Sequence, residues 1–207
     1  MRARHLAMRA SSALKTEPAT IPAEGPYLSA DDARIAKWRA RIEALERPRV
    51  ALAWAGNAQH INDCNRSIVL SRLAPLWSAV SPRFIGIQRE LRGEDAELLG
   101  REPRVMQIGA ELDDFADTAA VIALVDLVVS VDTSVAHLAG AMGRPVWVLL
   151  PFSPDWRWTL AGESSPWYPT ARLFRQPSLG DWDSVIERLC GELDRFAREV
   201  RTIPNGE

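Results

Sequence analysis

The 207-residue sequence holds only two cysteines, Cys64 and Cys190, too few for a disulfide framework. It lacks a basic excess, and its formal net charge of −2 argues against a nucleic-acid platform. Its longest apolar run, near residues 119–131, is interrupted by Asp126 and is too short to span a bilayer. We therefore expect no nucleic-acid partner and no membrane span, in a reducing, cytoplasmic setting.

Several motifs of nucleotide-binding and hydrolytic proteins are also missing. The loop "AGNAQH", after the first predicted strand, lacks the second and third glycines of a dinucleotide fingerprint. The sequence contains no P-loop, no Gly-x-Ser-x-Gly elbow and no metal-ligand spacing. These absences exclude the commonest rivals for an α/β fold and predict neither a cofactor nor a metal.

The first 28 residues differ in composition from the rest of the chain. The basic stretch "MRARHLAMRASSALK" lacks the apolar centre of a secretory signal, and prolines and a glycine follow in "TEPATIPAEGPY". We interpret residues 1–28 as a basic tail and proline-rich linker, and residues 29–207 as one domain. Helical spacing over residues 29–48 predicts an amphipathic helix, with Ser29 and Asp32 as its capping box.

From Arg49 onward, short apolar runs alternate with helical stretches. The runs predict strands at 50–56, 83–88, 104–109, 126–131, 146–151 and 171–174, and helices at 69–80, 94–101, 114–125, 133–142 and 181–200. The runs are almost continuously hydrophobic, so both faces of each strand should be covered, as in a parallel sheet. The alternation predicts an α/β fold with a doubly wound, mostly parallel sheet.

The stretch "LVVSVDTSVAHLAGAMGRP" carries polar residues directly after a buried strand. A helix beginning near Thr133 presents unpaired N–H groups that bind phosphate, and the hydroxyls of Thr133 and Ser134 add donors. His137, one turn later, can contact a phosphate or a sugar hydroxyl, most strongly when protonated. The alternative is that Asp132 or Thr133 is a plain N-cap and His137 a half-buried packing residue. The residues alone leave these two interpretations even.

A second polar segment follows the first predicted strand. Its residues are Asn57, His60, Asn62, Asp63, Asn65, Arg66 and Ser67. Asn57 can donate and accept, and the guanidinium fork of Arg66 suits a phosphate. Taken alone, the segment reads better as a solvated loop with an Asx turn. Carboxyl ends of parallel strands share one edge of a sheet, so this loop and the Asp132 segment together indicate a cleft more strongly than either alone.

Three further features have a structural alternative. Gln88 and Arg89 follow the second strand at the same edge, although Arg89 alone reads as a surface charge. Asp114 at the cap and Asp117 at the third position begin the helix at 114–125 as a near capping box, and we assign both to structure. Aromatic residues near the last two strands either stack on a sugar or base, or wedge a long loop against the domain, which we favour: Trp147, Trp156, Trp158, Trp167, Tyr168 and Trp182.

Together these segments resemble a known family. The stretches "VALAWAGNAQHINDCNRSI", "ADTAAVIALVDLVVSVDTSVAHLAGAMGRPVWVLLPFSPDWRW" and "SPWYPTARLFRQPSLGDWDSVI" are similar to the C-terminal, donor-binding half of GT-B glycosyltransferases of the heptosyltransferase type, glycosyltransferase family 9. The similarity is greatest to bacterial versions that follow tetratricopeptide repeats. It runs from about residue 20 to about residue 200.

The resemblance implies roles for individual residues. Asp132, Thr133, Ser134 and His137 would hold the diphosphate of a nucleoside-diphosphate sugar. Arg66 stands where the family usually has a lysine and would contact phosphate, so Arg66 and His137 are the implied catalytic residues. Ser134 stands where the family favours glycine, which leaves less room for the phosphate. The remaining implied substrate-binding residues are Asn57, His60, Ser67, Gln88 and Arg89.

The resemblance also bears on what completes the protein. Family members have two Rossmann-like halves, and the acceptor half normally contributes the catalytic base. The resemblance covers only the donor half, so it implies a metal-independent transferase that works with inversion once an acceptor half or tetratricopeptide partner completes it. An uncovered interdomain face would also favour self-association. The alternative is a non-catalytic remnant or interaction domain with a vestigial nucleotide-sugar pocket. The residues decide neither the sugar, base and acceptor nor whether the chain alone is an enzyme.

Overall fold

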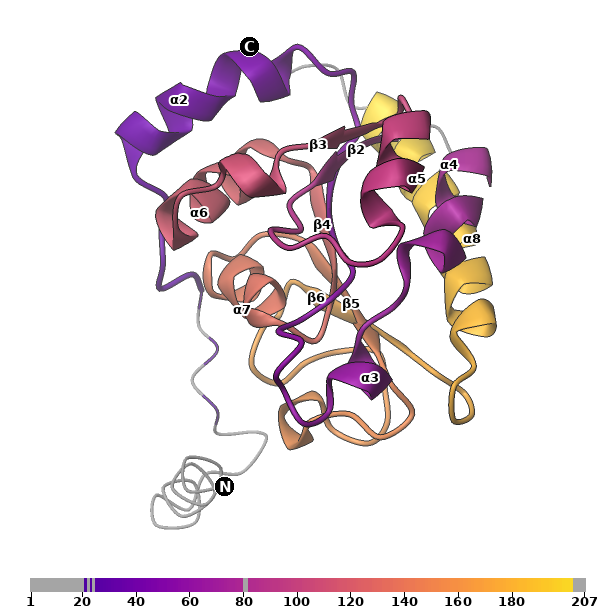
Figure 1. Cartoon of the computed structure of the whole chain (residues 1–207). Coiled ribbons are helices and arrows are strands. Elements are labelled where there is room, and N and C mark those ends of the chain that lie inside the picture. Colours follow the sequence, from indigo (N-terminus) through magenta and orange to yellow (C-terminus); the bar gives the residue numbers. More distant parts are fainter. Residues whose placement is uncertain (1–20, 22, 24, 80–81, 203–207) are drawn as a thin grey trace.

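A six-stranded sheet lies at the centre of the protein, in a computed structural model that describes residues 21, 23, 25–79 and 82–202. The strand order is β3-β2-β1-β4-β5-β6, and all neighbouring strands are parallel. The strands are β1 (Arg49–Ala53), β2 (Arg83–Gly86), β3 (Val105–Gln107), β4 (Leu127–Val131), β5 (Val146–Leu150) and β6 (Ala171–Arg175). The predicted doubly wound parallel sheet is confirmed (Figure 1).

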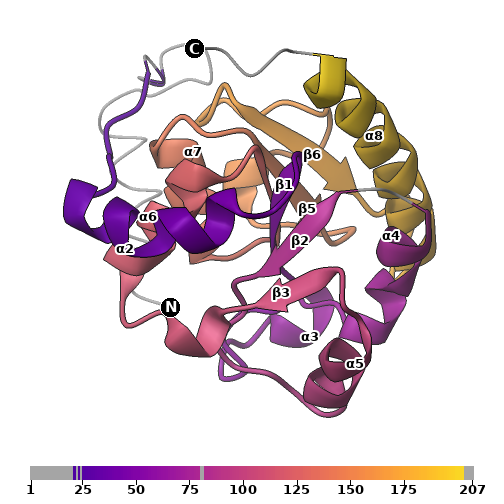
Figure 2. The same cartoon turned by 90° about the horizontal axis from the view of Figure 1, so that it is seen from above.

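Helices cover both faces of the sheet, as Figure 2 shows. One face carries α2 (Asp32–Glu43), α6 (Phe115–Leu124) and α7 (Ser134–Ala141). The other carries α4 (Ala74–Ala79), α5 (Asp95–Arg101) and the long α8 (Trp182–Thr202). Short turns complete the chain: α3 (Asp63–Arg66) and the 3₁₀ helices η2 (Leu70–Leu73), η3 (Gly109–Glu111) and η4 (Trp156–Trp158).

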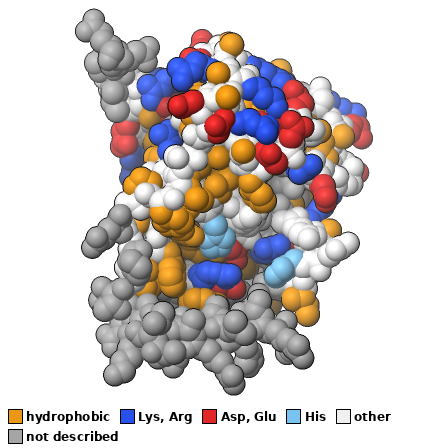
Figure 3. Space-filling view, turned by 90° about the vertical axis from the view of Figure 1, so that its left-hand side faces the viewer, with side chains coloured by type: hydrophobic (Ala, Val, Ile, Leu, Met, Phe, Trp, Pro, Cys, Tyr) orange, Lys and Arg blue, Asp and Glu red, His pale blue; other side chains and the backbone are white. Residues whose placement is uncertain are grey.

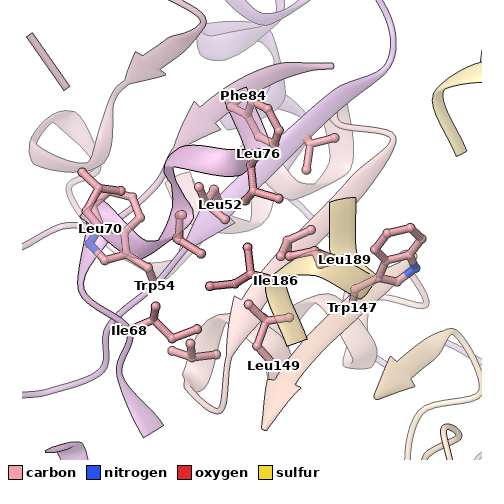
Figure 4. Close-up of a cluster of buried hydrophobic side chains, with 14 of the residues drawn as sticks. Leu52, Trp54, Ile68, Leu70, Leu76, Phe84, Trp147, Leu149, Ile186 and Leu189 are labelled. Carbon is pink, nitrogen blue, oxygen red and sulfur yellow. The ribbon is translucent and has the colours of Figure 1, made fainter. Parts of the chain in front are cut away.

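The strands divide the hydrophobic interior into two cores. Successive side chains of a strand point to opposite faces, so Val50 and Leu52 join the core under α4 and α8, while Ala51 and Ala53 join the core under α6 and α7. Figure 4 shows the first core, where Leu52 lies among side chains from α4 and α8. Burial on both faces explains the nearly continuous apolar runs of the sequence.

Three predicted strands extend past the observed ones at the carboxyl end. The predictions for β1, β2 and β3 ended at residues 56, 88 and 109, whereas the strands end at Ala53, Gly86 and Gln107. The next residues stay buried although they leave the sheet, as Trp54 and Ile87 show. The apolar run in the sequence therefore continues past the last residue of each strand, because the residues that follow are also buried.

The cap predicted for the first helix was wrong. Asp31 is the N-cap of α2, and its carboxylate accepts a hydrogen bond of 3.0 Å from the backbone N–H of Arg34. The helix begins at Asp32, so Ser29 lies too far upstream to cap it. An extended backbone at Asp31 brings its carboxylate to the first turn, as an N-cap requires.

The structural roles predicted for the two aspartates of α6 are confirmed. Asp114 caps the helix, and its carboxylate accepts from the N–H groups of Ala116 and Asp117. Asp117 is fully buried and accepts from Lys37 at 2.8 Å and from the Trp38 indole at 3.1 Å. Burial alone would raise the pKa of Asp117, but these hydrogen bonds hold it below its usual value. One buried carboxylate thus fastens α2 to α6.

The segment that leads into α2 lies against the end of α7. The N–H groups of Tyr27 and Leu28 both donate to the carbonyl oxygen of Ala141, at 2.9 and 3.1 Å. Pro26 packs beside Gly143, which has a positive φ of 64°. The end of the predicted linker is therefore attached to the domain, while the predicted basic tail, residues 1–15, lies outside the described residues. In the part of the chain that the structure describes, no helix has the length and apolarity to cross a membrane.

Candidate functional site

The sheet reverses its strand order between β1 and β4. These strands pair side by side, with Ala53 opposite Ser130, and their connections leave toward opposite sides of the pair. In parallel α/β sheets, ligands bind outside the carboxyl ends of the strands at this switch point. The two polar segments found in the sequence, which begin near Gly56 and at Asp132, both follow these two strands.

The first turn of α7 is open toward this edge. Thr133 is the N-cap, yet its side chain makes no hydrogen bond to the helix and instead contacts the Ser130 hydroxyl at 3.1 Å. Ser134 is exposed. The first N–H groups of a helix have no partner within it, so this terminus can donate to an anion. The alternative of a plain N-cap is confirmed for the position of Thr133, although without a side-chain hydrogen bond, while Asp132 accepts from the Trp158 indole at 2.8 Å.

His137 lies half-buried above this turn. Its ring stacks on Trp158 with centroids 5.0 Å apart, and its Nδ1 lies 3.1 Å from the hydroxyl of Tyr168. Burial lowers the pKa of His137, Asp132 opposes that effect, and Arg157 adds to it. The lowered pKa favours the neutral imidazole near pH 7. A neutral imidazole offers an anion an N–H donor. It does not offer the positive charge of the protonated ring, which we considered from the sequence.

Arg66 crosses from the β1 loop to the β4 turn. Its Nη1 donates to the carbonyl oxygen of Asp132 at 2.8 Å, and its Nε lies 3.7 Å from the carboxylate of Asp63. The side chain is only 13% exposed. Among the described residues Nη2 has no hydrogen-bond partner, so part of the guanidinium fork remains for a ligand. One part of the guanidinium group therefore makes structural contacts within the protein.

The loop after β1 is held by an ion pair and hydrogen bonds around Asp63, here called the Asp63 latch. The sequence did not reveal these contacts. Asp63 accepts from Arg92 at 2.6 Å and from the Ser67 hydroxyl at 2.7 Å. Arg92 also donates to the carbonyl oxygen of Gly56, whose N–H donates to Ser67. Burial favours a raised pKa for Asp63, but the hydrogen bonds of Arg92 and Ser67 lower it. Ser67, predicted to bind substrate, is engaged in this latch.

The other predicted residues lie near the ends of β1 and β2. Gln88 is buried and accepts from the N–H groups of Trp54 and Ala55, so it stabilises the backbone after β1. Arg89 and Asn57 are exposed at the same edge. His60 lies on the far side of the loop, where its Nδ1 accepts from the N–H of Asn62 at 3.1 Å.

Two clefts meet at the start of α7. The larger, about 1010 Å³, extends toward the ends of β5 and β6 and includes His60, Asp132 and His137. The smaller, about 820 Å³, extends toward the ends of β2 and β3 and includes Asn57, Gln88 and Arg89. Arg66, Thr133 and Ser134 line both. In Figure 3, histidine and Lys/Arg side chains lie together with hydrophobic ones in a hollowed part of the surface.

The aromatic residues divide between core and cleft. Trp147, Trp158 and Trp182 are buried, as expected for packing. Trp156 is 37% exposed, lines the larger cleft and meets Trp167 edge to face at 5.8 Å. The loop is therefore wedged against the domain while one indole remains available to a ligand. Within the described ranges, no group of three His, Cys, Asp or Glu side chains has a metal-binding arrangement.

Comparison with known proteins adds a family to this geometry. Residues 91–174 match the family model of glycosyltransferase family 9 (heptosyltransferase). The predicted resemblance to family 9 is confirmed. The match includes β4, the open turn at Asp132 and His137, and the loop that carries Trp158, so the family 9 segment contains one side of both clefts.

Two longer proteins are similar to the chain. The protein FlbA of Caulobacter vibrioides is 31% identical over 193 residues, which cover 89% of this chain and 31% of FlbA. The structure of E. coli ADP-heptose LPS heptosyltransferase II aligns with a TM-score of 0.58 at 17% identity, covering 84% of this chain and 54% of that one. The solved structure confirms the fold. The chain spans about a third of the length of FlbA and about half of the heptosyltransferase.

The sequence missed three residues that shape this region. Tyr168, Trp158 and Arg92 contact the predicted residues His137, Asp132 and Asp63. Trp158 and Tyr168 had been noticed only as part of an aromatic cluster. No local pattern marks these contacts, because the partners lie 26 to 31 residues apart in the chain.

Proposed function

We propose that the domain binds the nucleoside-diphosphate sugar of a glycosyltransferase and, together with an acceptor half, transfers the sugar with inversion. The observation that carries this proposal is the meeting of two clefts at Arg66, Thr133 and Ser134. A donor of this class has a nucleoside and a sugar on either side of a diphosphate. Its shape matches two clefts that share one anion-binding turn.

The smaller cleft suits the nucleoside. Its walls include the apolar side chains of Ala55, Ile87 and Leu112, and the exposed ring of Phe115 lies at its rim. Arg89 and Asn57 provide polar groups for a ribose or a base edge. Apolar side chains next to polar groups that fix orientation are typical of ligand sites in proteins.

The larger cleft suits the sugar. Besides His60 and Asn62, it is lined by Asp155, Arg157 and Gln176, which offer donors and acceptors for sugar hydroxyls. Trp156 adds an apolar face. Sugar rings pair hydroxyl groups with apolar C–H faces, so this mixture of side chains favours a sugar.

The diphosphate would then lie between the clefts, at the first turn of α7. As the bond to the sugar breaks, negative charge develops on the departing diphosphate. Arg66, the N–H groups of the α7 terminus and the N–H of His137 would stabilise that charge. These groups supply the positive potential that the reaction needs, so the proposal includes no metal ion at this position.

Three exposed apolar side chains, two of them near the larger cleft, support a second component. Ile61, Leu160 and Leu179 are 91%, 85% and 78% exposed. Leu179 lines the larger cleft, and Ile61 lies in its polar loop. Apolar residues at the rim of a site favour a covering partner. We propose that an acceptor half or a tetratricopeptide partner covers this edge and that the chain works in the cytoplasm.

Calorimetric titration with a panel of nucleoside diphosphates, monophosphates and nucleosides tests this proposal. We expect one diphosphate to bind more tightly than its monophosphate and its nucleoside. A second readout is alkylation of Cys64, which is exposed and lines the larger cleft, whereas Cys190 is half-buried elsewhere. Bound diphosphate or nucleotide sugar should slow alkylation of Cys64 only. No heat and no protection with any nucleotide at about 1 mM would favour the alternative, an interaction domain with a vestigial pocket.

A further inference from the structure

His137 is held by two aromatic side chains that the proposed function does not use. Its ring stacks on Trp158 with an interplanar angle of 19°, and Tyr168 approaches its edge with centroids 5.7 Å apart. Trp158 is fully buried, and Tyr168 is partly buried. The ring of His137 is therefore fixed in orientation, and only the position of its proton remains to be set.

The two ring nitrogens face different groups. Nδ1 lies 3.1 Å from the hydroxyl of Tyr168. Nε2 lies 3.8 Å from Oδ1 of Asp132, the oxygen that also accepts from the Trp158 indole at 2.8 Å. A carboxylate accepts and does not donate, so it favours a proton on the nitrogen that faces it. A hydroxyl can either donate or accept, so it can complement that choice.

Tyr168 is held firmly enough to act on His137. A Cβ atom at Gly140 would lie 2.4 Å from Cγ of Tyr168, so the ring packs directly on the backbone of α7. The N–H of Tyr168 donates to the Ser165 hydroxyl at 3.3 Å. Burial and then a hydrogen bond with Tyr27 raise the pKa of Tyr168, so its hydroxyl keeps its proton. That proton is available to Nδ1.

We propose that Tyr168 is a positioning residue that sets the tautomer of His137. In this arrangement the Tyr168 hydroxyl donates its proton to Nδ1 of His137. The imidazole proton then stays on Nε2, where it faces Asp132 and the larger cleft. This inference rests on the proposed function, because the Nε2–H group becomes a fixed donor for an oxygen of the diphosphate.

Loss of the Tyr168 hydroxyl has a defined chemical consequence. Without it, no neighbouring donor holds Nδ1 in its acceptor state, and the two tautomers draw closer in free energy. Molecules with the proton on Nδ1 present a lone pair at Nε2 and repel an anionic oxygen. The shape of the cleft is unchanged, so this effect differs from a loss of packing.

The tautomer can be read directly by ¹⁵N NMR of protein labelled at histidine. The full chain contains three histidines, so a His137→Gln variant identifies the relevant signals. At about pH 8, above the ordinary histidine pKa of about 6.5, we expect His137 to carry its proton on Nε2 alone. Tyr168→Phe should shift signal toward the Nδ1-protonated form. A proton on Nδ1 in the unmodified protein, or no change in Tyr168→Phe, would overturn the proposal.

Tyr27→Phe is the matched control. It removes a second hydroxyl that interacts with Tyr168 but keeps the Tyr168 hydroxyl as a donor to Nδ1, so the tautomer of His137 should not change. Tyr168→Phe should weaken diphosphate binding about fivefold, the equivalent of one net hydrogen bond, and leave nucleoside binding unchanged. The tautomer is measured without ligand. If no nucleotide binds, the proposed function fails, while the NMR result still decides the role of Tyr168.

Discussion

Nη1 of Arg66 donates a hydrogen bond of 2.8 Å to the carbonyl oxygen of Asp132. This bond joins the loop after β1 to the turn after β4, which are neighbouring strands at the point where the sheet changes direction. It places the guanidinium beside the turn that leads into α7, with Nη2 against Gly56, and Arg66 lines both clefts. One side chain therefore supports the turn and, in our proposal, binds the diphosphate held there.

Replacement of Arg66 separates phosphate binding from nucleoside binding. Arg66→Ala should weaken a nucleoside diphosphate about tenfold or more, because a charge-assisted hydrogen bond is lost, and leave the nucleoside within about twofold. Calorimetry at constant ionic strength measures both. Arg101→Ala is the control, since Arg101 is 74% exposed on α5 and lines neither cleft. Equal weakening of diphosphate and nucleoside would mean that Arg66 makes no phosphate contact.

A substitution at Gly56 should act through the same guanidinium. A Cβ atom there would lie 2.4 Å from Nη2 of Arg66, so Gly56→Ala should displace the end of this flexible side chain. We expect the fold to persist and diphosphate affinity to fall about as far as in Arg66→Ala. Gly100→Ala adds a methyl group in open space on α5 and should leave affinity unchanged. Unaltered affinity in Gly56→Ala would show that Arg66 does not need its present position.

Asp117 should account for much of the attachment of α2. Asp117→Asn leaves Lys37 and Arg34 beside a neutral amide, and we expect a loss of about 3 kcal/mol in the free energy of unfolding. Asp113→Asn, at a side chain 73% exposed, should cost less than about 1 kcal/mol. Urea unfolding followed by circular dichroism compares the two variants. Similar losses would argue against a special role for the buried carboxylate.

The same carboxylate should influence stability in acid. Hydrogen bonds lower the pKa of Asp117 in the folded state, so the unfolded chain takes up its proton first as the pH falls. The contribution of Asp117 is therefore complete above its ordinary pKa of about 3.9 and is lost below that value. Unfolding curves between about pH 5 and pH 3 should fall more steeply for the unmodified protein than for Asp117→Asn.

His137 should make stability depend on pH in a higher window. Burial, with Arg157, lowers the pKa of His137 despite Asp132 and Asp155, so the unfolded chain binds the proton more readily than the folded one. The free energy of unfolding should therefore fall as the pH drops below about 6.5. Tyr168 faces the same ring, but its hydroxyl stays protonated in this range. In His137→Gln the slope between about pH 7 and pH 5.5 should be smaller, and an unchanged slope would assign it to other groups.

Transfer activity gives a further expectation. The chain spans 54% of the heptosyltransferase to which it is structurally similar, and in our proposal the acceptor half supplies the base for the acceptor hydroxyl. His137 serves the donor in our proposal, and Asp63 is bound by Arg92 and Ser67. We therefore expect donor binding with little or no transfer, together with self-association visible by light scattering. Robust transfer by a monodisperse monomer would contradict this and would make His60 the base to test.

The sequence predicted the sheet well because its signal is local. Each strand is covered on both faces, so its apolar residues form an unbroken run, as in β4 and β5. The polar residues after β1 and β4 were brought together by a rule of topology, since the carboxyl ends of parallel strands share an edge. Neither prediction needed the position of an individual side chain.

Side-chain contacts between distant residues could not be predicted in this way. The interaction of His137 with Tyr168 joins residues 31 apart, and that of Arg66 with Asp132 joins residues 66 apart. The structural contacts of Ser67 and Gln88 were not predicted either: both side chains accept hydrogen bonds from backbone N–H groups that follow β1. These unpaired backbone groups arise only when the chain folds, and no periodic pattern in the sequence marks them.

The division of the interior by the sheet has a consequence for engineering. His137, Trp158 and Tyr168 lie on the side of α7, whereas the core formed by α4 and α8 shares no buried side chain with that side. Substitutions at Leu76 and Leu189 should therefore add their free energies to those made around His137 with little coupling. Stabilising substitutions on the α8 side should raise the melting temperature and leave the proposed site on the opposite face of the sheet unchanged.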